Sequence, residues 1–93
     1  MREIERTSRF KRDYKREARG RHRSILPESL ADVLRLLAAD APLPERYRDH
    51  ALSGDWSGYR DCHIRPDLVL IYEKPDAATL RLIRLGSHSE LGF

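Results

Sequence analysis

The spacing of the apolar residues changes near the middle of the chain, and this change constrains the fold more than any other feature. In the first half, Leu30, Val33, Leu34 and Leu37 recur at the spacing of one face of an α-helix. In the second half, the runs GYRDCHI, DLVLIYE and TLRLIRL are rich in the residue types of extended strands. The sequence therefore predicts helices followed by a sheet, which is an α+β fold.

The first half predicts a short edge strand and two helices. Residues 1–7 alternate in polarity, as an edge strand does. Thr7 or Ser8 can cap a first helix that ends at Gly20, with a buried stripe formed by Phe10, Tyr14 and Ala18. Pro27 fits the first turn of a second helix, which ends near Asp40 and carries the apolar face described above.

The second half predicts a small antiparallel sheet. Residues 68–72 are apolar on both faces, so we expect this strand to be central and covered by the helices on at least one side. The connections RP and KPDAA are too short for parallel crossovers, which favours hairpins. At 93 residues, we expect residues 1–93 to form a single domain.

Charge is distributed unevenly along the chain. Lys and Arg number 18 against 15 Asp and Glu, but residues 1–24 carry ten basic and four acidic side chains. Such a segment favours binding to a phosphate backbone or another polyanion. The alternative is that these charges form a solvated helix face. No segment has the pattern of a signal peptide or the length of a membrane span, so we expect a cytoplasmic protein with no membrane partner.

The single cysteine, Cys62, cannot form an internal disulfide, which indicates a reducing compartment. We expect it to be a small packed strand residue, with a reactive thiol as the less supported alternative.

Three of the four histidines, His50, His63 and His88, lie in the second half beside Asp67. Histidines titrate near neutrality, so their convergence at one rim of the sheet would supply a base and an acid near pH 7. Asp67 could orient one imidazole or raise its pKa, or it could cap the RPD turn through its own backbone. A metal site built from the same four residues is a rival hypothesis, although no compact ligand spacing such as HExxH is present.

RNA is a fitting substrate for such a set because it supplies its own nucleophile, the 2′-hydroxyl. A base would withdraw that proton, an acid would protonate the departing 5′-oxygen, and Arg84 or Arg60 could stabilise the charged phosphorane. This cleavage leaves a 2′,3′-cyclic phosphate and requires no metal or cofactor. Trp56, between two glycines, could stack on a base or close one end of the core, and the terminal Phe93 could stack on a nucleotide.

The order YRDHALSGDWSGYRDCHIRPDLVLIYE followed by LRLIRLGSHSELGF resembles the YafQ branch of the RelE/ParE toxin superfamily over essentially the whole chain. The resemblance implies a RelE-like fold, with an N-terminal strand and two helices packed on a small antiparallel β-sheet. It also implies a toxin of a type II toxin–antitoxin system, namely a ribosome-dependent endoribonuclease that cuts mRNA in the decoding site. Its partners would be a cognate antitoxin, in a toxin–antitoxin hetero-oligomer, and the ribosome with its mRNA.

The same resemblance implies roles for individual residues. His50, His63, Asp67 and His88 match positions associated with catalysis, and Phe93 matches a position associated with substrate engagement. The chain departs from the family pattern at two places. Leu68 stands where a member of the family has tryptophan, and the ending SELGF sets the phenylalanine one residue further from His88 than the family's ALF pattern does.

A non-enzymatic module that binds nucleic acid or protein, including a ParE-like gyrase inhibitor, is the alternative from another functional class. The histidine set argues against a ParE-like gyrase inhibitor, because inhibition by binding requires no groups that transfer protons, whereas a binding module with merely structural histidines stays open. The sequence leaves open the codon preference, the identity of the antitoxin, the stoichiometry of their complex and the choice of base and acid among the histidines.

Overall fold

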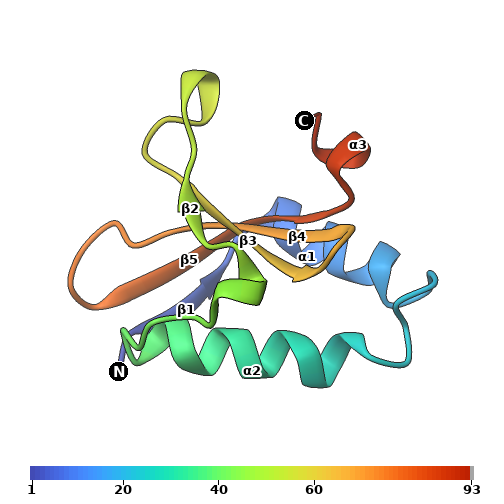
Figure 1. The fold of residues 1–93 in the computed structure, drawn as a ribbon, viewed down its shortest axis with the longest axis horizontal. Coiled ribbons are helices and arrows are strands. Elements are labelled where there is room, and N and C mark those ends of the chain that lie inside the picture. The colour runs from blue at the N-terminus through green and yellow to red at the C-terminus, as the bar shows by residue number, and fades with distance from the viewer. Residues whose placement is uncertain (93) are drawn as a thin grey trace.

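The computed structural model describes residues 1–92, which form three helices, two short 3₁₀ turns and one sheet of five strands (Figure 1). The strands are β1 (Glu3–Arg6), β2 (His50–Ala51), β3 (Arg60–Arg65), β4 (Leu68–Glu73) and β5 (Thr79–Gly86). The helices are α1 (Ser8–Glu17), α2 (Leu26–Ala38) and α3 (His88–Leu91), and the 3₁₀ turns are η1 (Glu45–Tyr47) and η2 (Gly54–Trp56). The α+β class is confirmed.

The sheet has the strand order β1-β5-β4-β3-β2. Strands β3 to β5 form the antiparallel meander that the short connections predict, and β2, a two-residue strand that was not predicted, pairs antiparallel with β3. Strand β1 is an edge strand, as expected, but it pairs in parallel with β5, with Ile4 opposite Leu80, so the complete sheet is mixed. The chain's first and last strands are therefore neighbours, and β4 is the central strand.

The main core lies between the sheet and α2, which runs along one face of the sheet (Figure 1). The predicted stripe on α2 is buried, and it packs in the same cluster as Leu68, Leu70 and Tyr72 of the central strand. Leu68 is fully buried, so the position that departs from the family pattern serves as a core residue in this chain.

Helix α1 begins as predicted, because the Thr7 side chain accepts a hydrogen bond from the backbone N–H of Phe10. Its buried face is partly different from the prediction. Ala18 is exposed, and the helix ends at Glu17 rather than at Gly20. Two acidic side chains, Asp13 and Glu17, are buried instead.

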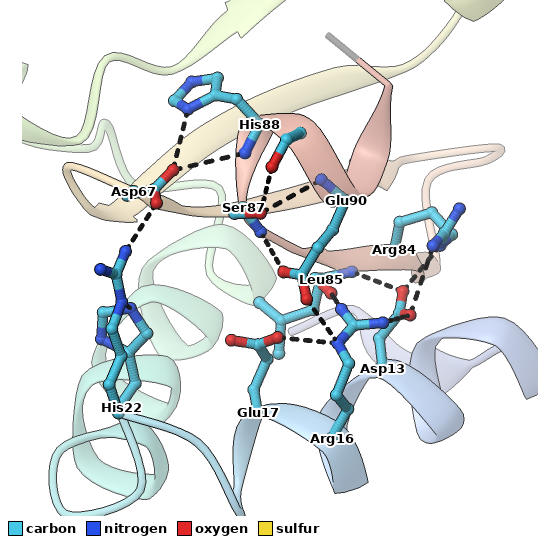
Figure 2. Close-up of polar contacts among 12 residues, drawn as sticks. Asp13, Arg16, Glu17, His22, Asp67, Arg84, Leu85, Ser87, His88 and Glu90 are labelled. Carbon is cyan, nitrogen blue, oxygen red and sulfur yellow. Dashed lines mark hydrogen bonds and ion pairs between the residues drawn. The ribbon is translucent and has the colours of Figure 1, made fainter.

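Asp13 is buried because α1 lies against the part of the β5 edge that extends beyond the pairing with β1. The Asp13 carboxylate accepts the backbone N–H of Leu85 at 3.0 Å, and Arg16 donates to the Leu85 carbonyl at 2.8 Å (Figure 2). Thr7 donates its hydroxyl proton to the carbonyl of Leu82 at 2.8 Å. Side chains of the helix thus satisfy backbone groups that another strand would otherwise pair.

The opposite face of the sheet carries a smaller apolar cluster. Val69, Ile71 and Leu91 are buried there, against half-buried side chains that include Trp56 and Tyr59. Helix α3 and the segment with η2 rise on this side, away from α2 (Figure 1). Within residues 1–92, every helix is too short or too polar to cross a membrane.

Candidate active site

The three histidines of the second half come from three different elements and lie close together. His50 begins β2, His63 lies in β3, and His88 is the first residue of α3. The ring centroids of His50 and His63 are 6.5 Å apart, and those of His63 and His88 are 5.1 Å apart. The convergence that the acid–base hypothesis requires is therefore present, with the His63 ring between the other two.

Asp67 joins this group through His88. Its Oδ1 atom lies 3.3 Å from His88 Nδ1 and 3.4 Å from the His88 backbone N–H donor, while Oδ2 accepts a hydrogen bond from Arg21 at 2.6 Å (Figure 2). These contacts, with His88 first and Arg21 next, lower the pKa of Asp67 and keep it ionised at neutral pH. Of the two roles open to Asp67, the geometry favours orientation of an imidazole.

His88 owes its position to the start of α3. Ser87 caps this helix by accepting the backbone N–H of Glu90 at 3.1 Å, and the Glu90 carboxylate accepts the Ser87 N–H at 2.8 Å. This capping box fixes the backbone at the residue that carries the imidazole. Arg16 of α1 contacts the same Glu90 carboxylate at 3.0 Å and so ties α3 to the N-terminal helix.

A second carboxylate, the buried Asp61, contacts His50 and was not predicted from the sequence. It is 3% exposed, and its Oδ1 atom is 3.0 Å from Nδ1 of His50, which is its register partner across β2 and β3. Burial raises the pKa of Asp61, whereas the charges of His50, His63 and His88 oppose that rise. The available signal was strand alternation, because Asp61 and His63 are two residues apart and share one face.

His63 is half-buried, and its neighbours act on its pKa. Partial burial, followed by the charges of His88, Arg48 and His50, lowers its pKa below the ordinary value of 6.5, although Asp61 acts in the opposite direction. His63 is therefore mostly neutral at pH 7, which is the form that accepts a proton.

The comparison with known proteins identifies the family. A family model described as a bacterial toxin of type II toxin–antitoxin systems, YafQ, matches residues 2–92. The chain belongs to the YafQ family. It is therefore a toxin of a type II toxin–antitoxin system, as the resemblance of its motifs implied.

Individual YafQ proteins are similar over different lengths. The mRNA interferase toxin YafQ of Escherichia coli K12 is 41% identical over 92 residues, covering 98% of this chain and 96% of that protein. A putative toxin YafQ of Haemophilus influenzae is 56% identical over 52 residues, so the match spans about half the length of that relative, 51%.

Solved structures share the fold. A copper-bound mutant toxin from Helicobacter pylori has a TM-score of 0.88 at 36% identity, covering 98% of this chain and 99% of that one. YafQ in the Escherichia coli DinJ–YafQ toxin–antitoxin complex has a TM-score of 0.81 at 37% identity, covering 98% of each chain.

Arg84, a predicted charge stabiliser of this YafQ-family site, is engaged by a carboxylate of α1. Its guanidinium donates to both oxygens of Asp13, at 2.7 and 3.3 Å (Figure 2). Arg16 contacts the same carboxylate at 3.0 Å, so two cations share one buried anion. To contact a phosphate, the Arg84 guanidinium would need a hydrogen-bond donor that is not used by Asp13. The catalytic role of Arg84 stays a prediction.

Two of the three predicted substrate-binding residues, Arg60 and Trp56, contact other side chains of the protein. Arg60 contacts Asp49 at 3.3 Å. Partial burial alone would lower the pKa of Arg60, but its hydrogen bonds with Tyr72 and Asp49 raise it. Trp56 packs edge-to-face on Tyr59 with a centroid separation of 5.8 Å, in the smaller apolar cluster, which fits core closure. Phe93 lies outside the described residues.

Within residues 1–92, no group of three or more His, Cys, Asp or Glu side chains has an arrangement that could hold a metal ion. The Helicobacter toxin bound to copper shows that a related protein can bind a metal. Cys62 is fully buried, and burial strongly raises the pKa of its thiol, so it is an unreactive packed residue as expected.

Proposed function

We propose that this single domain, residues 1–93, is an endoribonuclease that cleaves mRNA in the decoding site of the translating ribosome and so inhibits translation. The observation that carries the proposal is the convergence of His50, His63 and His88, with Asp67 on His88 and Asp61 on His50. The kinship with the Escherichia coli mRNA interferase toxin supports mRNA as the substrate. A function on ribosomes requires the cytoplasm.

The proposed reaction is general acid–base catalysis without a metal. His63, held neutral by its surroundings, withdraws the proton of the 2′-hydroxyl, whose oxygen then attacks the adjacent phosphorus. His88 gives a proton to the 5′-oxygen as the bond between phosphorus and that oxygen breaks. The products are a 2′,3′-cyclic phosphate and a 5′-hydroxyl. Asp67 accepts a hydrogen bond from Nδ1 of the His88 imidazole and so orients the ring.

His50 is the second candidate acid. Its Nδ1 atom lies 2.8 Å from the carbonyl oxygen of Arg48 and 3.0 Å from Asp61, so its ring is fixed through one nitrogen and presents the other. Arg84 or Arg60 would stabilise the phosphorane, each at the expense of its present ion pair.

The antitoxin partner would occupy a groove between α1 and α2. This groove of about 500 Å³ is lined by apolar side chains, including Phe10, Tyr14 and Leu34, with Lys11 and Lys15 also on its wall. An acidic amphipathic helix has the shape and charge that such a groove accepts. The DinJ–YafQ complex shows that a related toxin assembles with an antitoxin.

Alanine substitutions test the catalytic assignment. We expect His50→Ala, His63→Ala and His88→Ala each to relieve growth arrest, with cleavage rates on programmed ribosomes lowered on the order of 10²–10⁴-fold. The matched control is His22→Ala, which removes a histidine that lies in the turn before α2. Each variant is first shown to be folded by circular dichroism.

Full toxicity in all three folded cluster variants would remove the acid–base proposal. Growth arrest with intact messages would instead support the binding module. Activity that is lost in a chelator and restored by zinc, on ribosomes kept intact with magnesium, would contradict the metal-free mechanism.

A further inference from the structure

A cleft of about 870 Å³ opens beside the histidine cluster, and the mechanism above does not use most of it. His63 and His88 lie at one part of its wall. The rest includes Arg46, Tyr47, Arg48 and Arg65, which we call the arginine wall. Three guanidinium groups and one aromatic ring therefore border the space next to the reacting groups.

The fold attaches the arginine wall directly to the catalytic residues. Arg48 follows η1 in the left-handed conformation, with φ of 49°, and its carbonyl oxygen lies 2.8 Å from His50 Nδ1. A residue other than glycine in this conformation costs free energy, on the order of 1 kcal/mol, and such strain concentrates at functional sites. Arg65 follows His63 by two residues, next to the irregularity in the β3–β4 pairing.

Two of these guanidinium groups are available to a ligand. Arg48 and Arg65 are exposed, and neither takes part in an ion pair with another described residue. The acidic residue of the cleft, Asp32, is neutralised by Arg35 at 2.9 Å. The cleft therefore presents unbalanced positive charge, and the guanidinium fork matches the oxygens of a phosphate.

The third guanidinium lies over an aromatic ring. The guanidinium carbon Cζ of Arg46 is 4.8 Å from the centroid of the Tyr47 ring, and Arg46 also donates a hydrogen bond to the Tyr47 hydroxyl at 3.1 Å. Tyr47 is half-buried and packs against the main core, so its ring is held in place. A fixed planar surface of this kind suits the stacking of a base.

We propose that the cleft is a nucleotide subsite of the RNase: Arg48 and Arg65 bind a phosphate next to the scissile one, and the Arg46–Tyr47 platform stacks the adjoining base. This inference rests on the proposed function. A single-stranded RNA carries a phosphate and a planar base in each unit, which is the combination that the wall presents. An acidic protein segment would use the arginines but has no base for the platform.

The phosphate contact is tested with a non-cleavable RNA trinucleotide that carries 2′-deoxy sugars at its cleavable positions, titrated by NMR. The double variant Arg48→Asn/Arg65→Gln removes two charges, and asparagine tolerates the left-handed backbone. Its matched control, Arg9→Asn/Arg12→Gln, removes two exposed charges from α1. We expect at least tenfold weaker binding for the first and at most a threefold loss for the control.

Salt gives a second readout of the same interaction. The slope of log affinity against log salt should fall by about 0.7 for each phosphate that the wall variant no longer neutralises. Equal losses in both double variants would reduce the effect to overall charge and overturn the phosphate subsite.

The stacking interaction is tested by a double-mutant cycle that combines Tyr47→Leu with trinucleotides abasic at each position in turn. We expect the losses from the protein and RNA changes to be non-additive at one position, because both remove the same interaction. Arg46→Gln is the second variant, which leaves the ring and its packing intact and should weaken binding less. Additive losses at every position, in folded variants, would overturn the platform.

Two further outcomes separate this inference from others. Unchanged trinucleotide binding together with weaker binding of an acidic antitoxin peptide would assign the cleft to a protein partner and overturn the subsite. If wild-type protein cut no message on ribosomes but still showed the coupling at Tyr47, the catalytic proposal would fail, while nucleotide binding by the cleft would stand.

Discussion

At the scale of single residues, the site pairs imidazoles with carboxylates in two different environments. Asp67 is half-exposed and stays ionised, held by His88 and Arg21. Asp61 is buried, and burial raises its pKa even though three histidines surround it. Asp61 therefore contacts His50 in a buried environment, whereas Asp67 contacts His88 in a half-exposed one.

Asp61→Asn separates charge from shape, because asparagine is nearly isosteric. Since the ionised carboxylate raises the pKa of His63, its loss should move the acid limb of the cleavage–pH profile to lower pH. We also expect a rate lower by at least about tenfold, since an imidazolium loses its counter-charge. The free energy of unfolding at pH 8 should stay the same or rise, because burial raises the pKa of Asp61 and its ionisation therefore costs free energy in the folded state.

Single-turnover cleavage on programmed ribosomes between pH 5 and 9 measures the profile, and urea unfolding measures stability. Asp55→Asn, an exposed carboxylate in η2, is the control. An unshifted acid limb with a wild-type rate would exclude a positioning role for Asp61.

At the scale of elements, helix α1 connects the sheet edge to the helix that carries His88. The Asp13 carboxylate accepts a hydrogen bond from the backbone N–H of Leu85 in β5. Arg16 contacts the carboxylates of Asp13, Glu17 and Glu90 at 2.9–3.0 Å (Figure 2). Gly86 makes room for this arrangement, because a Cβ there would lie 2.7 Å from a guanidinium nitrogen of Arg16. Since α3 has only four residues, its position depends on such contacts more than on its own helical stability.

Asp13→Asn should destabilise the fold by about 3 kcal/mol at pH 7, the range expected when one partner of a buried ion pair is removed. Burial alone would raise the pKa of Asp13, but Arg84, the Leu85 N–H and Arg16 together lower it. The stabilisation from this ionised carboxylate is therefore present above the unfolded-state pKa of about 3.9. It is lost as the pH falls through the lower folded-state pKa.

Urea unfolding at pH 7 and at low pH checks this prediction. The difference between wild type and Asp13→Asn should shrink as the wild-type carboxyl group becomes protonated. Asp32→Asn, from an exposed pair on α2, should change stability by less than about 1 kcal/mol. A similar small effect for Asp13→Asn would show that the network is dispensable.

The elements whose apolar pattern was complete could be predicted from sequence, and those held by polar contacts could not. The α2 stripe and the doubly apolar β4 fixed the main core and the central strand. The parallel pairing of β1 with β5 joins segments far apart in the chain, which periodicity does not reveal. Asp13 looked like one more solvated charge of a basic helix, because its partner, the free edge of β5, exists only in the folded chain.

The candidate site shows the same division. Residue type and motif spacing identified His50, His63, Asp67 and His88, and the structure brings them together. Arg84 was also selected by type, but the geometry gives it a buried carboxylate partner that the sequence does not reveal. The arginine wall could not be predicted from the sequence, because its residues come from two separate segments that are neighbours only in the fold.

At the scale of the whole molecule, we propose that the histidine cluster cuts mRNA while it is being translated. The chemistry leaves a signature in the products, since attack by the 2′-hydroxyl gives a 2′,3′-cyclic phosphate and a 5′-hydroxyl. The dependence on the ribosome leaves another, since only translated copies of a message should be cut. Both signatures are read in one experiment.

That experiment maps new 5′ ends after induction, on a message with its start codon and on the same message without it, for wild type and His88→Ala. We expect 5′-hydroxyl ends within the translated copy, none in the untranslated copy, and loss of these ends in the folded variant. The same ends in untranslated RNA, 5′-phosphate ends, or unchanged cleavage by His88→Ala would contradict the proposed function.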